Sequence, residues 1–313
     1  MIRSIRWALA LPMLLVAACG GTDDGSAPAA PDDGIRDLRV EIPAADPNFI
    51  DFVGAEVVVQ PGEDKMICTH FRYDGEDIAF SLQETLQGKF GHHAILLSAK
   101  EPLPPGTMED CTDVASMAKF DPFTVPSYEL PAGRGTFLPK GKALVLQSHY
   151  LNSGAVPIRI RDVVRLKTMP VAAVEKWASM YVTNDYGFEL APHGPGESKF
   201  DCVISEDVTL LLVGGHMHER GTRFEALIGE DEASLESIYL VDPWVGDYRD
   251  NPPVSLFFEN PRPLPAGTIV RTHCSWNNPD MGPVAFPNEM CSTFGFVEGP
   301  KDAIKCFIGG ETK

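Results

Sequence analysis

Short apolar runs separated by turn-forming residues recur along the chain after about residue 40. They include residues 94–97, 143–146, 208–213 and 268–270, and Gly, Pro, Asn or Asp lies near the ends of each. Runs of this length and composition are typical of β-strands. The 27 prolines and 28 glycines leave room for only short helices, which we expect near residues 110–119 and 171–180. The pattern therefore predicts an all-β protein whose antiparallel strands pack as β-sandwiches.

A weak internal repeat predicts two domains. GHH at residues 91–93 recurs as GHMH at 215–218, and LPKG at 138–141 recurs as LPAG at 264–267. A predicted strand follows each Leu-Pro motif and ends at a histidine, His149 in the first copy and His273 in the second. Short matches also arise by chance, but two at nearly one offset favour duplication. We expect two tandem β-sandwich domains, at residues 35–170 and 171–313.

The N-terminus predicts export and a lipid anchor. Residues 1–18 have the basic start, short apolar run and small-residue end of a signal peptide, and Cys19 follows directly. This end resembles a bacterial lipobox, which implies cleavage before Cys19 and lipidation of its sulfur; an ordinary signal with a chance cysteine is the alternative. Gly20, in place of Asp, favours the outer membrane. Residues 19–34 contain no large apolar side chain and are predicted to be a disordered tether to the cell envelope.

Charge and cysteine content narrow the function further. The formal net charge of −18 argues against a nucleic-acid partner. Lipidation of Cys19 would leave an even number of cysteines, and in an exported chain that indicates disulfides. Six cysteines allow fifteen sets of pairs, so composition alone does not fix the pairing. The six are Cys68, Cys111, Cys202, Cys274, Cys291 and Cys306.

Five of the eight histidines lie in three tight contexts that suggest metal ligands. His216 and His218 are two apart, so on a strand they share a face while Met217 points the other way. His92 and His93 are adjacent, so both reach one metal only where the backbone is irregular. With His149 they would form a three-nitrogen site that suits copper, zinc, iron or nickel.

Met290 discriminates among these four candidate metals. A thioether is a soft ligand that favours cuprous copper, although read alone Met290 would be an ordinary core side chain. The ordered motifs GHH, LQSHY, HMH and NEMC resemble the copper type II, ascorbate-dependent monooxygenases, the family of peptidylglycine hydroxylating monooxygenase and dopamine beta-monooxygenase. The resemblance covers nearly the whole chain from about residue 35, and the combination of four motifs in order is specific.

The resemblance implies two tandem jelly-roll-like domains with one copper site in each. In the first, His92, His93 and His149 would hold the electron-transfer copper; in the second, His216, His218 and Met290 would hold the oxygen-binding copper. His273 is the competing third ligand from the internal repeat, while His70 and His193 match no family ligand. The resemblance also implies three disulfides: Cys68 with Cys111, Cys202 with Cys306, and Cys274 with Cys291.

The implied activity is hydroxylation of a C–H bond in a small organic substrate with dioxygen and a reductant such as ascorbate. This needs two electrons, and two one-electron coppers supply them without a protein acid or base. Gln147 matches a glutamine near the family's first site, although an ordinary polar strand residue is the alternative.

The carboxylate clamp of the peptidylglycine enzymes is absent, because Gly214, Ser292 and Phe294 occupy its positions. A peptide ending in glycine is therefore not the expected substrate, since a buried carboxylate needs a charged partner. Arg220 and Arg223 could replace that charge or could be solvated strand-end residues.

Two other functions are weighed against catalysis. A copper-binding lipoprotein that buffers or delivers the metal would need the ligands but not two distinct ligand sets. A zinc or iron cupin-like barrel is the third possibility, and it is disfavoured because the residues after His218 offer no carboxylate at the cupin spacing.

Overall fold

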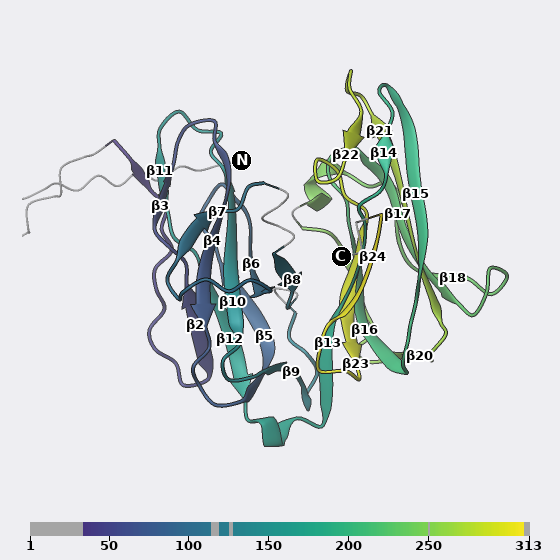
Figure 1. Cartoon of the computed structure of the whole chain (residues 1–313), viewed down its shortest axis with the longest axis horizontal. Helices are drawn as coiled ribbons and strands as arrows, with labels where there is room; N and C mark the ends of the chain where they lie inside the picture. The colour runs from purple at the N-terminus through teal and green to yellow at the C-terminus, as the bar shows by residue number, and fades with distance from the viewer. Residues whose placement is uncertain (1–33, 114–118, 125–127, 250, 310–313) are drawn as a thin grey trace, which may run out of the picture. The chain divides into compact units, whose positions relative to one another are not determined.

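The computed structural model describes residues 34–113, 119–124, 128–249 and 251–309. Gly34–Lys313 form one compact unit built from β-strands (Figure 1). In the described ranges the only helical pieces are two short 3-10 turns, η1 (Val171–Ala173) and η2 (Gly246–Arg249). The all-β prediction is confirmed. The predicted signal peptide, the lipidation site at Cys19 and nearly all of the tether lie outside the described residues.

The strands before η1 form two main sheets with an apolar core between them. Phe80 and Leu166 from one sheet meet Leu96, Leu144 and Leu146 from the other in one buried cluster. The first sheet has the order β7 (Met108–Asp110), β4 (Asp64–Arg72), β10 (Ala143–Leu151), β6 (Gly91–Ala99) and β8 (Phe120–Pro122). The second contains β9 (Arg134–Leu138), β5 (Ile78–Leu86), β12 (Val163–Met169) and β2 (Phe49–Val53). A small sheet flanks them, made of β1 (Arg36–Asp37), β11 (Ile158–Ile160) and β3 (Val57–Val59).

The strands after η1 repeat the two-layer arrangement. Val213 and Val297 of one layer meet Phe224 and Trp276 of the other in a second core. One layer has the order β19 (Val254–Leu256), β16 (Val208–His216), β23 (Ser292–Glu298) and β13 (Lys176–Asp185), with β20 (Arg262–Leu264) and β24 (Ile304–Ile308) beside it. The other consists of β15 (Gly194–Val203), β21 (Ile269–Asn278), β17 (Gly221–Gly229) and β18 (Glu236–Val241). β14 (Glu189–Leu190) and β22 (Val284–Ala285) form a two-stranded ribbon.

A short parallel pairing of β9 with β13 joins the two sets of sheets. Next to it, the carboxylate of Glu298, which is only 4% exposed, accepts hydrogen bonds from Arg134 and Lys176, both at 2.7 Å. η1 lies at residue 171, where the sequence predicts the junction, and the division into two domains stays a prediction.

Three of the four apolar runs named in the sequence lie wholly in strands, namely β6, β10 and β16, and the run at 268–270 enters β21 at Ile269. The expected helix at 171–180 is wrong. η1 covers only the start of that range, and from Lys176 onward the chain is the buried strand β13, paired with β9, β23 and β24. Tertiary pairing thus overrides the helix preference of the local Ala and Glu residues. The expected helix at 110–119 is not found either: residues 108–110 form β7 and 111–113 are non-helical, while 114–118 lie outside the described residues.

The three disulfides are confirmed. They join Cys68 to Cys111, Cys202 to Cys306 and Cys274 to Cys291.

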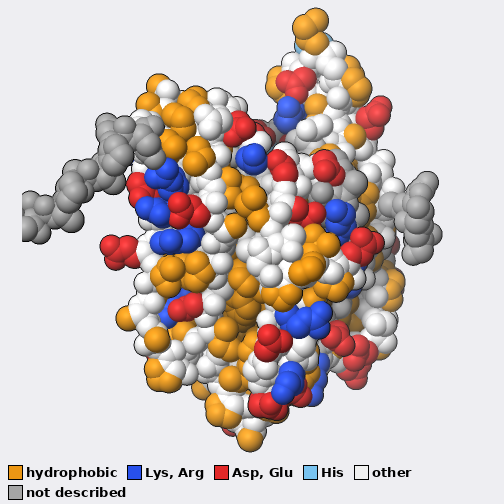
Figure 2. Space-filling view, turned by 60° about the vertical axis from the view of Figure 1, so that its left-hand side comes forward, with side chains coloured by type: hydrophobic (Ala, Val, Ile, Leu, Met, Phe, Trp, Pro, Cys, Tyr) orange, Lys and Arg blue, Asp and Glu red, His pale blue; other side chains and the backbone are white. Residues whose placement is uncertain are grey.

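On the face drawn in Figure 2, acidic and basic side chains are intermixed, so the negative net charge is not gathered into one patch there. In the part of the chain that the structure describes, no helix is long and apolar enough to cross a membrane.

Candidate metal centres

Three imidazoles converge at the ends of β6 and β10. The ring of His149 lies 4.8 Å from that of His92 and 5.0 Å from that of His93, measured between centroids. The register pairs His149 with His93 but Tyr150 with Gly91, so His92 is the extra residue of a β-bulge. The irregular backbone expected from the adjacent histidines is therefore present. It lets both neighbours approach the ring of His149.

Hydrogen bonds orient two of these rings. His149 Nε2 lies 2.5 Å from Asp64 Oδ1, and His93 Nε2 lies 3.1 Å from Gln147 Oε1. Both rings therefore direct Nε2 to a protein oxygen, which leaves Nδ1 as the nitrogen that can face a metal. The sequence left open whether Gln147 is an ordinary strand residue or lies near the first site, and its side chain contacts the candidate ligand His93. Asp64 was missed, because only the pairing of β4 with β10 brings it to His149.

Burial favours the neutral form of His93 and His149. It lowers the pKa of His93 to about 4, and it also lowers the pKa of His149, against the opposing effect of the Asp64 carboxylate. A neutral imidazole is the form that binds a metal. Among the described residues, no group of three or more His, Cys, Asp or Glu side chains has the geometry to hold a metal ion. The donor chemistry of this group nevertheless fits a copper ion, because the imidazoles of His92 and His93 both lie close to that of His149.

A second pair of histidines lies at the end of β16. The rings of His216 and His218 are 5.1 Å apart, while Met217 between them is fully buried in the core, as its place in a His-x-His pattern predicts. The register pairs His216 with Ser292 of β23, two residues after Met290. His218 Nδ1 lies 3.3 Å from the carbonyl oxygen of Asn288, which leaves its Nε2 to face a metal. Burial lowers the pKa of His218 to about 4 and that of His216 well below its usual value.

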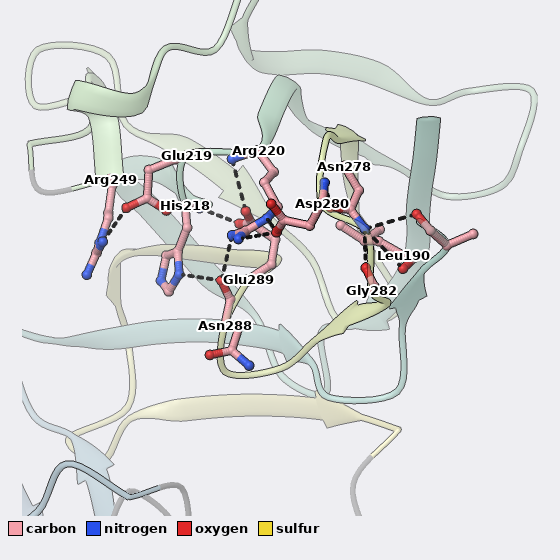
Figure 3. Close-up of polar contacts among 11 residues, drawn as sticks. Leu190, His218, Glu219, Arg220, Arg249, Asn278, Asp280, Gly282, Asn288 and Glu289 are labelled. Carbon is pink, nitrogen blue, oxygen red and sulfur yellow. Dashed lines mark hydrogen bonds and ion pairs between the residues drawn. The ribbon is translucent and has the colours of Figure 1, made fainter. Parts of the chain in front are cut away.

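Glu289 is a residue of this region that sequence reasoning missed. Its side chain is fully buried, and Oε1 accepts hydrogen bonds from the backbone N–H groups of Met290, at 3.0 Å, and of His218. Oε2 accepts from the N–H of Arg220 at 3.2 Å. Figure 3 shows this carboxylate between the segment that follows β16 and the segment that precedes β23. Two imidazoles with a thioether on the adjoining segment fit a cuprous site in donor chemistry.

The remaining histidines take no part in either group. His273 lies on β21, in the sheet opposite β16 and β23, and its Nε2 faces Glu197 Oε2 at 3.2 Å. His70 is buried and its Nε2 lies 2.8 Å from Glu109 Oε1, so its role is structural. His193 occupies a turn with φ of 50°.

The arginines near the second group differ in their partners. Arg220 binds Asp280 at 2.9 and 2.6 Å, and Arg223 binds Glu225 at 2.6 Å. Arg249 of η2 contacts Glu219, and its guanidinium lies beside the His218 imidazole in Figure 3. Its charge helps lower the pKa of His93 and His149 as well as of His216 and His218. The two histidine groups are therefore near enough to share one cation, a proximity that no pattern in the sequence indicates.

Comparisons with known proteins add little. No family model matches the chain, and no curated protein matches it. Among solved structures, a chain from the structure of infectious bursal disease virus, Gx strain, is similar over 80% of this chain and 70% of that chain. Its sequence identity is 11% and its TM-score is 0.20. A similarity this weak carries no argument about fold or function.

Proposed function

We propose that this protein is a copper-dependent monooxygenase that hydroxylates a C–H bond of a small organic substrate with dioxygen and an external reductant such as ascorbate. The observation that carries the proposal is the separation of the donors into two unlike groups. One group offers three imidazoles; the other offers two imidazoles beside the segment that carries Met290. Copper, when bound, would supply one-electron redox chemistry toward dioxygen.

In this proposal the chain itself orients donors and excludes water. Asp64 and Gln147 fix the ring orientations of His149 and His93, which favours one nitrogen of each ring as the ligand. Met217 and the apolar core beneath the second group keep solvent from one side of it. The tandem jelly-roll arrangement, with one copper site in each half, belongs to the same proposal.

The substrate is expected to lack the terminal carboxylate of a glycine-extended peptide. A Cβ at Gly214 would lie 2.5 Å from the ring of Phe294, so the aromatic ring fills the space next to this residue. These two positions are those of the absent clamp, and neither carries a charged or hydrogen-bonding side chain. Arg220 and Arg223 are each held by a carboxylate, which argues against their serving as its replacement.

The alternative is a non-catalytic copper-binding lipoprotein of the cell envelope. Two ligand groups of different composition favour catalysis, because storage needs only one kind of site. Both functions place the chain outside the cytoplasm, anchored through a lipid on Cys19 and attached by the tether.

Oxygen uptake by the copper-loaded protein tests the proposal. With ascorbate as the electron source, uptake should depend on a second organic compound drawn from a panel of neutral and anionic candidates. Stoichiometric copper binding without any compound-dependent uptake across the panel would favour the storage function instead.

A further inference from the structure

Glu289 is a buried carboxylate that the proposed chemistry does not use. None of its side chain is exposed, and it accepts hydrogen bonds from the backbone N–H groups of His218, Arg220 and Met290. The guanidinium of Arg220 is directed to Asp280. A buried charge is costly unless hydrogen bonds compensate it, and here these backbone N–H groups supply the compensation.

The three N–H groups belong to two segments that no strand pairing joins. β16 ends at His216 and β23 begins at Ser292, and these two residues are partners in the sheet. His218 and Met290 both lie beyond that last pair. The Cys274–Cys291 disulfide fixes the residue after Met290 to β21, and His218 Nδ1 faces the backbone of Asn288. The Glu289 side chain is thus a direct link between the backbones of the two candidate ligands.

We propose that Glu289 is the positioning residue of the second copper centre. Its carboxylate fixes the spacing of the His218 and Met290 backbones, so that an imidazole and a thioether from separate segments are held near each other before the metal arrives. This inference rests on the proposed function. A carboxylate suits the task because both of its oxygens only accept hydrogen bonds, whereas a glutamine would turn an N–H₂ donor toward one of the N–H groups.

Copper titration of Glu289→Gln tests the role. The matched control is Glu298→Gln, which alters another buried acid at the far end of β23, the strand that follows the segment carrying Glu289. With cuprous ion, E289Q should bind its second copper about 10–100-fold more weakly, the usual effect of losing an outer-sphere partner, while the first stays bound. X-ray absorption should show the copper–sulfur contribution reduced in E289Q and retained in E298Q.

A second measurement needs no metal. In the copper-free protein, amide hydrogen exchange at His218, Arg220 and Met290 should accelerate together in E289Q, while β16 and β23 remain protected, which shows that the chain is folded. Unchanged exchange at these amides would overturn the inference. So would wild-type affinity for two coppers with an intact sulfur signal. If the wild-type protein itself binds no copper, the proposed function fails and the inference fails with it.

Discussion

At the residue scale, a single extra residue in β6 decides whether the first histidine group can exist. In a regular strand His92 and His93 would face opposite sides of the sheet. The bulge opposite His149 and Tyr150 turns both rings toward His149. Gln87, in the loop between β5 and β6, donates from Nε2 to the carbonyl oxygen of His93 at 2.8 Å, which ties the irregular stretch to that loop. The group is therefore shaped by backbone geometry as much as by histidine content.

Replacing Met290 should affect the second proposed copper centre and leave the first unchanged. Met290→Ile keeps an apolar side chain of similar size but removes the proposed sulfur donor of the second group. We expect turnover to be abolished and the copper–sulfur signal to disappear in X-ray absorption, with the first centre still occupied. Full activity in this variant would exclude Met290 as a ligand.

Acid should weaken the metal-free fold through its buried histidines. The pKa values of His93 and His218 are lowered by burial from 6.5 to about 4. Between these values the unfolded chain binds protons that the folded chain does not, so the free energy of unfolding rises with pH. The expected slope is up to about 1.4 kcal/mol per pH unit for each histidine.

Urea denaturation of the copper-free protein at a series of pH values measures this slope. Replacement of His218 by Asn, which cannot titrate, should flatten part of it. A stability profile that is level over the same interval would show that these rings are already charged or exposed in the folded chain.

At the element scale, the strands were predictable and their partners were not. The runs at 94–97 and 208–213 are long enough in apolar residues to require burial, so period and composition place them in strands. Residues 171–180 show the limit: Ala172, Ala173 and Glu175 favour a helix locally, but the chain becomes β13 because three neighbouring strands pair with it. Local preference is worth tenths of a kcal/mol per residue, and sheet pairing outweighs it.

The candidate site was predictable in its donors but not in its supporting residues. His-x-His and the adjacent histidines carry a signal in their spacing alone. Asp64 and Arg249, by contrast, are far from every histidine group in sequence and reach the rings only through strand pairing and the fold. Glu289 is next to Met290, but nothing in a single sequence indicates that its side chain turns back to the His218 backbone. Such contacts follow from tertiary structure.

The disulfides should differ in what they stabilise. Cys202–Cys306 closes a loop of 104 residues and Cys274–Cys291 one of 17. Replacing each pair by alanine should lower the free energy of unfolding by about 4–5 kcal/mol for the first and about 3 kcal/mol for the second. Only the second replacement should weaken the second copper, because Cys291 adjoins Met290. Denaturation and copper titration of both variants check this, and equal copper loss in the two would contradict it.

At the scale of the whole molecule, the two histidine groups belong to different sets of sheets. The first group lies on strands before η1 and the second on strands after it. The charge of His93 nevertheless contributes to the lowered pKa of His216, so the two groups are within electrostatic reach. The proposed transfer of one electron between two copper centres would require such proximity.

The proposed lipid anchor on Cys19 is tested in a chain that keeps residues 1–34. Cys19→Ser should abolish attachment of radiolabelled palmitate and move the protein from the detergent phase to the aqueous phase of a Triton X-114 partition, because lipid supplies the membrane affinity. Cys68→Ser, which removes a different cysteine, should leave labelling intact. Labelling of the Cys19→Ser protein would place the lipid elsewhere.

The copper content of the purified protein, combined with X-ray absorption of its cuprous form, tests the proposed pair of copper centres most directly. We expect two coppers per chain, with nitrogen donors at both and one sulfur donor at one of them. One copper per chain, or two with no sulfur contribution, would contradict it.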